Sequence, residues 1–126
     1  MRFYDELARL EREGFEIIVD KTYEDIHPRD CFDFYDKEDL DQLIKDIDMG
    51  KYEWFMLRVR ALIDGHEMGS SYLGGMLYED PMECLTDGTA DDCIYEAVKE
   101  AKSRVWPLMR RLQAINETME LEAVRG

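Results

Sequence analysis

The stretch Tyr52–Ile63 constrains the fold of this chain more than any other. Its residues alternate between two sets, with Trp54, Met56, Arg58, Arg60 and Leu62 in one and Phe55, Leu57, Val59, Ala61 and Ile63 in the other. A period of two is typical of a strand that buries one face. Asp64-Gly65 follows at once and favours a tight hairpin, because a primed turn needs positive φ at both central residues. The sequence therefore predicts a long strand that turns back on itself.

The return strand of this hairpin follows from the two-residue turn. The expected pairs are Ile63 with His66, Ala61 with Met68, and Leu57 with Tyr72, which places Met68, Tyr72 and Met76 on the face of Phe55, Leu57 and Val59. Three glycines interrupt the return strand, at Gly69, Gly74 and Gly75. Glycine inside a strand indicates a bulge or the close approach of another backbone.

The first twenty residues are expected to form a helix and then a strand. Phe3, Leu7 and Leu10 recur at helical spacing, and Gly14 is typical of a helix end. The β-branched run inside Phe15–Asp20 predicts a short strand.

A loop and a second helix are expected next. Lys21–Tyr35 has no clean period, and His27-Pro28 breaks any longer helix there, although one helical turn fits. Asp36 is a candidate N-cap for a helix with an acidic first turn, which Gly50 ends.

The C-terminal part is expected to be mostly helical. A short helical turn is predicted around Met82–Leu85, and Thr89 with Asp92 resembles a capping box. Pro107 is expected to kink or restart the following helix, because proline lacks a backbone donor. The tail from Asn116 is expected to fray. The apolar stripe of this helix consists of Ile94, Val98, Ala101 and Val105, continued by Leu108, Leu112 and Ile115.

Together these segments predict an α+β fold. We expect a small, roughly three-stranded, mostly antiparallel sheet with helices packed on one face and a long C-terminal helix. The chain of 126 residues is long enough to bury a core and is expected to form a single domain over residues 1–126. The strand order stays open.

The charge of the chain is strongly acidic and unevenly distributed. Thirty Asp and Glu residues oppose sixteen Lys and Arg residues, a formal net charge of −14. The excess lies in Asp20–Asp48 and Asp64–Glu100, and Lys99 is the single Lys or Arg of the second stretch. Such a field repels nucleic acids and anionic membranes and attracts basic protein surfaces. A net charge of magnitude ~2–8 is enough for the solubility of a small domain, and −14 exceeds this range. Acidity that serves solubility alone stays an open alternative.

Other features favour a cytoplasmic protein. No apolar run approaches a membrane span, and the start Met1–Glu6 lacks the regions of a signal peptide. The odd set Cys31, Cys84 and Cys93 has no paired spacing, which argues against a disulfide scaffold. These cysteines are expected to be buried thiols. The alternative is a metal site that combines Cys84 and Cys93 with His27, Cys31 or His66.

No motif names a reaction, so we expect a non-enzymatic protein without a cofactor. Asp30, Asp33 and Asp36 recur every three residues but lack the glycine and terminal glutamate of an EF-hand loop. Asp20-Lys21 matches part of the pattern of a nuclease site, but the sequence lacks the basic surface that would bind nucleic acid. A metal-dependent hydrolase or calcium-binding protein stays an alternative. So does a structural or assembly protein that uses an apolar contact surface of Met49, Trp54, Met56, Trp106 and Met109.

Two segments resemble small proteins carried by phages and plasmids: Leu73–Tyr78 and the helical segment Asp91–Ala97. In size, acidity and lack of a catalytic motif, the chain is also similar to anti-defence proteins of the anti-CRISPR and anti-restriction type. That resemblance implies an inhibitor that binds a CRISPR or restriction effector, in some cases as a mimic of nucleic acid, in the host cytoplasm.

These observations predict a partner-binding surface of acidic residues. Carboxylates on a compact scaffold can imitate a nucleic-acid backbone, whose duplex form carries one charge per ~1.7 Å of axis. The expected partner is the basic surface of a nucleic-acid-handling complex, and a homodimer stays open. The candidate residues are Asp30, Asp33, Asp36, Glu38, Asp41 and Asp48 in one patch, and Glu79, Asp80, Glu83, Asp87, Asp91 and Asp92 in a second patch.

Overall fold

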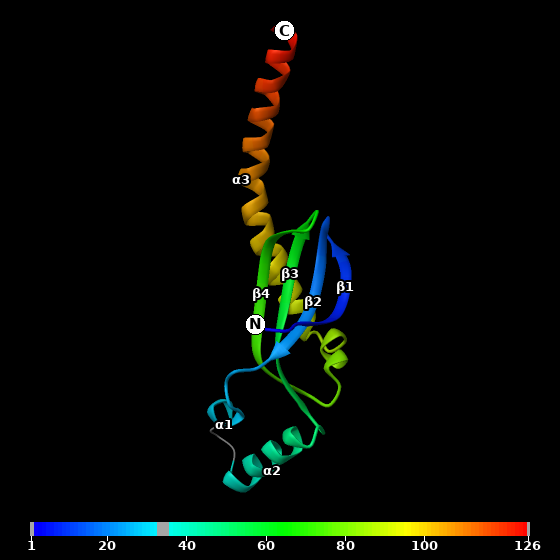
Figure 1. Cartoon of the computed structure of the whole chain (residues 1–126), viewed down its shortest axis with the longest axis vertical. Coiled ribbons are helices and arrows are strands. Elements are labelled where there is room, and N and C mark those ends of the chain that lie inside the picture. The colour runs from blue at the N-terminus through cyan, green and yellow to red at the C-terminus, as the bar shows by residue number, and fades with distance from the viewer. Residues whose placement is uncertain (1, 33–35, 126) are drawn as a thin grey trace.

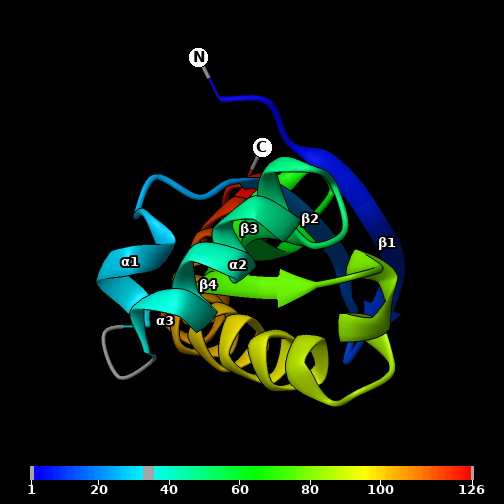
Figure 2. The same ribbon diagram turned by 90° about the horizontal axis from the view of Figure 1, so that it is seen from below.

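Four antiparallel strands form a meander, and one long helix crosses a face of this sheet (Figure 1, Figure 2). The computed structural model describes residues 2–32 and 36–125. The α+β class, the antiparallel pairing and the long C-terminal helix are confirmed, and the sheet has four strands rather than about three. The elements are β1 (Asp5–Arg12), β2 (Phe15–Tyr23), β3 (Glu53–Ile63) and β4 (His66–Tyr78), in the order β1-β2-β3-β4, and the helix α3 (Thr89–Arg125).

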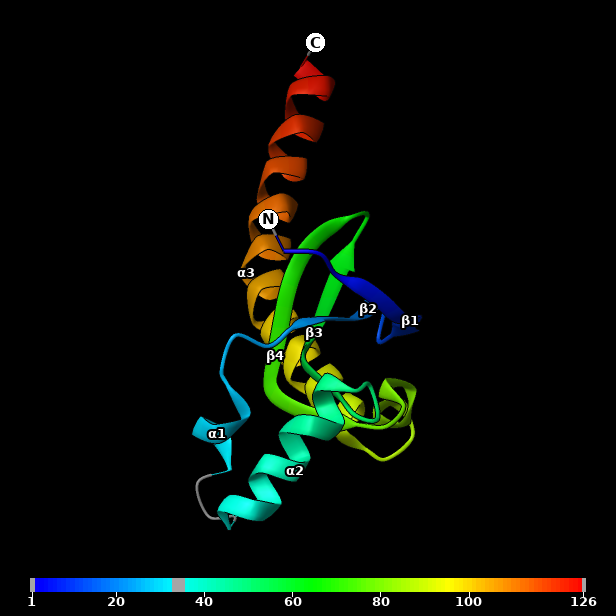
Figure 3. The same cartoon turned by 60° about the horizontal axis from the view of Figure 1, so that its bottom comes forward.

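The shorter helices lie between these elements. α1 (Pro28–Cys31) and α2 (Lys37–Asp48) interrupt the chain between β2 and β3 and lie beyond one end of the sheet (Figure 3). The 3-10 helix η1 (Pro81–Leu85) connects β4 to α3, where a helical turn was predicted. Asp36 is the N-cap residue of α2, as predicted, although its side chain makes no capping hydrogen bond. The expected packing of helices on one face therefore holds for α3 but not for α2.

The N-terminal segment is a strand, and the predicted helix is wrong. β1 pairs with β2 across a turn at Glu13 and Gly14, whose φ angles are 53° and 89°. Positive φ at both positions is the requirement of a tight hairpin rather than of a helix end. A bulge adds the extra residue Leu7 to β1, so that Leu7 and Leu10 both pack against the core. Their spacing of three residues imitates a helical period.

The hairpin at Asp64-Gly65 is confirmed, and both turn residues have positive φ. Ile63 pairs with His66, as predicted. Beyond this pair the register shifts by one residue, so the predicted pairs of Ala61 with Met68 and of Leu57 with Tyr72 are wrong, and the observed partners are Gly69 and Leu73. The physical cause is a bulge, which the glycines of this strand had indicated.

The shift decides which side chains of β4 reach the core. Met76 lies opposite Phe55 and is buried, and Met68 packs partly against the core, as expected. Tyr72 instead lies opposite Arg58 on the other face of the sheet and is exposed. The predicted core face of β4 is thus correct at both ends of the strand and wrong in the middle.

The core lies between α3 and the strands β2, β3 and β4. Ile17, Val19, Leu57 and Val59 are fully buried on the sheet side. Burying an aliphatic side chain of this size contributes about 1.5–3 kcal/mol, so this layer dominates the stability of the fold. The buried residues of α3 that face it are Ala90, Cys93, Ile94, Ala97, Val98 and Ala101.

Gly69 lets the backbone of α3 approach β4. A Cβ atom at this position would lie 2.2 Å from the carbonyl oxygen of Ala97 and 2.6 Å from the amide nitrogen of Ala101. Both alanines are completely buried. The close backbone approach that the glycines predicted is therefore confirmed here.

α3 continues as one helix through Pro107, so the helix bends rather than restarts. Its axis changes direction near the place where it leaves the sheet (Figure 1, Figure 3). Val105 still packs partly against the core. A proline inside a helix removes one backbone hydrogen bond and bends the axis. Residues 106–124 are all exposed. The tail from Asn116, which was expected to fray, is helical.

We predict that Gly69→Ala lowers the free energy of unfolding by about 3 kcal/mol, the upper end for overpacking, because the new methyl group meets backbone atoms that cannot rotate away. Gly74→Ala is the matched control on the same strand. A Cβ at Gly74 meets the flexible carboxylate end of Glu24 rather than backbone, so we expect a smaller loss. Urea denaturation of the two variants measures both values, and equal losses would contradict the proposed backbone contact.

Candidate partner-binding surface

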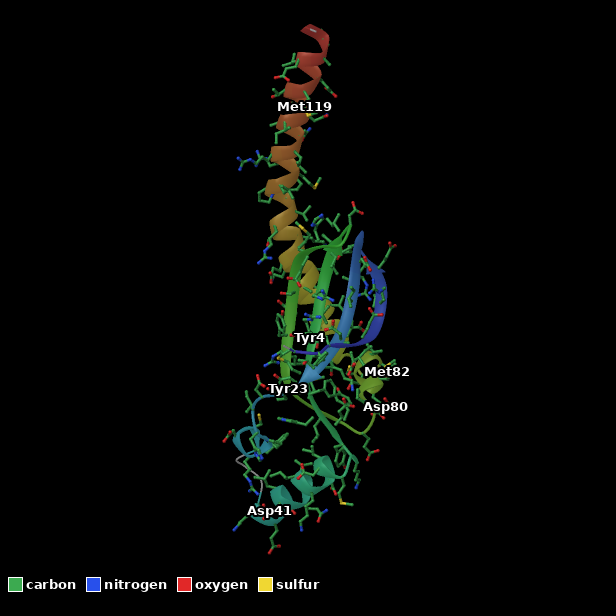
Figure 4. The ribbon with its side chains drawn as sticks, viewed as in Figure 1. Tyr4, Tyr23, Asp41, Asp80, Met82 and Met119 are labelled. Carbon is green, nitrogen blue, oxygen red and sulfur yellow. The ribbon has the colours of Figure 1, made fainter. Side chains whose placement is uncertain are left out.

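The first predicted patch lies on α1 and α2, at the end of the molecule opposite the C-terminus (Figure 4). The apolar stripe of α2 turns inward, where Ile44 and Ile47 line a shallow hollow with Trp54. The opposite side of the helix therefore faces solvent. Asp33 lies outside the described residues. The other members, here called the α1–α2 acidic group, are Asp30, Asp36, Glu38 and Asp48, which are exposed, and Asp41, which is half-buried.

The second predicted patch follows β4 through η1 into the first turn of α3. Residues 79–92 contain no Lys or Arg, so this segment carries only negative charge. Every predicted residue of this patch is exposed. We call the set the η1–α3 acidic group: Glu79, Asp80, Glu83, Asp87, Asp91 and Asp92.

Both groups lie in the half of the molecule away from the C-terminus, but on separate elements. Figure 4 shows Asp41 at the far end of the molecule and Asp80 beside the lower part of the sheet, while Met119 marks the opposite end. The structure therefore gathers each predicted patch locally and does not merge the two into one continuous surface.

Some of these carboxylates have structural partners. The Asp41 carboxylate accepts a hydrogen bond from Arg29 at 2.6 Å, which holds the pKa of Asp41 below its ordinary value of 3.8. Asp80 accepts from the backbone N–H of Met82 at 3.0 Å and caps η1. Asp41 therefore connects α2 to α1, and Asp80 stabilises the start of η1.

Asp87 and Asp91 are also engaged. The Tyr78 hydroxyl donates to Asp87, which also accepts from the backbone N–H of Thr89 at 2.9 Å. These hydrogen bonds lower the pKa of Asp87 and fix the start of α3, in the place where the sequence predicted a capping box beginning at Thr89. Asp91 lies 3.9 Å from Arg12 of β1, at the limit of an ion pair.

The remaining predicted residues have no such partner. Their side chains make no hydrogen bond or ion pair within residues 2–32 and 36–125, and all of them are exposed. They are Asp30, Asp36, Glu38 and Asp48 of the first group and Glu79, Glu83 and Asp92 of the second. Most of the predicted surface therefore consists of exposed acids that form no ion pair with a described residue.

The cysteines do not form the alternative metal site in the described part of the chain. Cys84 and Cys93 are buried in the core, whereas Cys31 belongs to α1. Burial raises the pKa of the Cys84 thiol to about 11, so this group stays protonated. Among the described residues, no cluster of three or more His, Cys, Asp or Glu side chains has the geometry of a metal site.

Sequence reasoning missed a charged cluster on the open face of the sheet. Asp20 is 3% exposed and accepts two hydrogen bonds from Arg58, at 2.8 and 2.6 Å, while Arg60 lies 3.4 Å away. The Arg58 guanidinium stacks on the ring of Tyr4, with 3.4 Å to the ring centroid. This cation–π contact pins the N-terminal segment across the sheet. Asp20 is therefore a structural ion-pair residue here, and the signal was the i, i+2 spacing of two arginines on β3.

Comparisons with known proteins add no neighbour. No family model matches the sequence, and no similar protein was found among curated proteins or solved structures. None of the described helices combines the length and the apolarity that crossing a bilayer requires.

The Asp87 hydrogen bonds predict a pH-dependent contribution to stability. A carboxylate with a lowered pKa stabilises the folded state above its unfolded-state pKa, and this contribution is lost as the pH falls through the lower folded-state value. We expect Asp87→Asn to lower the Tm near neutral pH, and the difference from wild type to shrink below about pH 3.8, the ordinary value of the group. Glu79→Gln, which removes an exposed and unpaired acid, is the control. A pH-independent difference for Asp87→Asn would refute the assignment.

The Asp20–Arg58 pair predicts a large loss on truncation. Removing one partner of a buried ion pair costs about 3–5 kcal/mol, because the other charge is left buried and unpaired. We expect Asp20→Ala to lose about 3 kcal/mol in chemical denaturation, at the lower end because Arg58 keeps the Tyr4 ring. Asp25→Ala, which breaks the exposed ion pair with Arg2, should lose less than ~1 kcal/mol. Similar losses at both sites would show that the buried pair has no special weight.

Proposed function

We propose that this protein is a non-enzymatic inhibitor that binds the basic groove of a nucleic-acid-handling complex. The observation that supports this function is the exposure of the two acidic groups. Their unpaired members, such as Glu38 and Asp48 on α2 and Glu79 and Glu83 near η1, face solvent and form no ion pair with a described residue. An acid that is already paired with a base of its own protein gains little from contact with a cationic groove. The unpaired acids named above remain available for such a contact.

The charge spacing along α2 supports a groove that holds a single strand. From Asp36 to Asp48 the chain carries six acidic residues and two lysines. The twelve residues of α2 span about 18 Å at ~1.5 Å per residue. Over that length, one nucleic-acid strand carries about five charges and a duplex about ten. The net charge of this segment is therefore close to that of one strand and well below that of a duplex.

The net charge of the whole chain supports the same function kinetically. A chain with a formal charge of −14 is attracted to a basic cleft before contact, which raises the association rate. The resemblance to anti-defence proteins suggests the class of partner, a CRISPR or restriction effector in the cytoplasm of a bacterial host. In this role the protein occupies the site of the nucleic acid and does not bind nucleic acid itself.

The proposal is tested by capture and displacement. Affinity capture from a bacterial host lysate, followed by mass spectrometry, identifies candidate complexes, and each purified complex is then titrated with the protein while its bound DNA or RNA is followed by fluorescence anisotropy. We expect stoichiometric displacement. Two triple charge reversals, Asp36→Lys/Glu38→Lys/Asp48→Lys and Glu79→Lys/Glu83→Lys/Asp92→Lys, should each lower the association rate constant about 10-fold at low salt and flatten its salt dependence.

A matched variant separates the acidic groups from net charge. Glu11→Lys/Glu67→Lys/Glu96→Lys changes the total charge equally at three exposed acids outside both groups, and it should reduce the rate much less. Equal effects of all three variants, or binding that does not depend on salt, would contradict the groove-binding function. Tight stoichiometric binding of Ca²⁺, Mg²⁺, Mn²⁺ or Zn²⁺ in calorimetry would favour the metal-dependent alternative instead.

A further inference from the structure

The C-terminal part of α3 forms an arm that projects beyond the sheet (Figure 1, Figure 4). We define the arm as residues 106–124, all of which are exposed. At ~1.5 Å per residue it is about 28 Å long. A polar, solvated helix of this length would be marginal by itself. The arm, however, is not polar on all sides.

One face of the arm is an apolar seam. Leu108, Leu112, Ile115 and Met119 follow one another at spacings of four, three and four residues, and they are 44%, 54%, 49% and 61% exposed. Alternating spacings of three and four are the heptad pattern of a coiled coil. The seam continues the stripe that packs on the sheet, ending there with Val105. The same stripe thus finds the sheet as its partner in the body and has none among the described residues of the arm.

The net charge changes sign along this part of the helix. Lys102, Arg104, Arg110 and Arg111 lie toward the body, and Glu117, Glu120 and Glu122 lie toward the tip, where the sequence has one base, Arg125. If two arms packed in parallel, basic segments would face basic segments, acidic segments would face acidic ones, and the two acidic bodies would lie side by side. In an antiparallel pair, each basic segment faces an acidic segment, and the bodies lie at opposite ends. Charge complementarity therefore selects a second copy of this chain in antiparallel orientation.

We propose that the arm is a homodimerisation element in which two copies form an antiparallel coiled coil along this seam. The heptad register places Leu112 opposite Ile115 of the second copy and Leu108 opposite its Met119. The overlap then runs from Leu108 to Met119, the exposed part of the seam. Figure 1 shows that the arm extends past the hairpin turns of the sheet, so the body leaves this overlap open. The inference is independent of the proposed partner complex.

Sedimentation equilibrium of the full chain tests the dimer. We expect a dimer at micromolar concentration for the wild type. Leu112→Asp, in the seam, should raise the dimer dissociation constant about 100-fold or more, because each dimer loses two buried leucines, each equivalent to roughly tenfold. Leu121→Asp is the matched control: it makes the same change at an exposed residue of the arm, 63% exposed and outside the seam, and it should leave the dimer intact. At protein concentrations low enough for both variants to be monomeric, their Tm values should agree, because neither residue contributes to the core.

Disulfide trapping tests the orientation. In a Cys31→Ser background, which removes the half-exposed native thiol, the double variant Leu108→Cys/Met119→Cys should form a covalent dimer on mild oxidation. Leu108→Cys alone should not, because its partner in the antiparallel register is Met119. A monomeric wild type, a larger oligomer, equal effects of Leu112→Asp and Leu121→Asp, or efficient trapping by Leu108→Cys alone would each overturn the proposal.

Discussion

The contact between the first half of α3 and the sheet is the interaction on which the rest of the structure depends. The helix covers the face of the meander that carries the main core, and the side chains of Ile17, Val19, Leu57 and Val59 would otherwise be open to water. Small residues at the contact, Gly69 on β4 and Ala97 and Ala101 on the helix, bring the two backbones close together. This contact also sets the direction in which the arm leaves the body and holds the η1–α3 acidic group against the sheet, through Cys84 of η1.

The opposite face of the sheet holds a buried ion pair beside the buried side chains of Ile18 and Leu62. Asp20, buried on this face, is neutralised by Arg58, and the ring of Tyr4 covers the guanidinium. The charged residues of the buried ion pair and those of the acidic groups therefore have different surroundings. Arginines of β3 compensate a buried acid inside the fold, while the two acidic groups on α1, α2 and the segment around η1 are mostly exposed to solvent.

Local sequence signals predicted the elements whose cause is local. Asp64-Gly65 fixed the β3–β4 turn and its first pair, and Asp36 marked the start of α2. The pairing beyond that turn could not be predicted in the same way. It includes a bulge near Gly69, where β4 closely approaches the backbone of α3, a helix distant in sequence. The helix expected at the N-terminus failed for a related reason, since the bulge at Leu7 converts a strand into an apparent helical spacing.

The candidate surface shows the same division. The exposure of most of the acids followed from their place in polar segments of the sequence. Which of them are engaged did not, because Asp41 and Asp87 find their partners, Arg29 and Tyr78, through the folded arrangement of different segments. The Asp20–Arg58 pair was invisible for the same reason: its members are far apart in the chain, and β-sheet register alone brings them together.

The continuity of α3 through Pro107 has a geometric consequence for how a dimer of this protein would bind a partner. One continuous helix joins the core to the tip of the arm, so a pair of chains packed antiparallel along their arms would point their acidic ends in opposite directions. Such an assembly could not insert both ends into one cleft. It would instead bridge two separate target molecules, and the bend at the proline would set the angle between them.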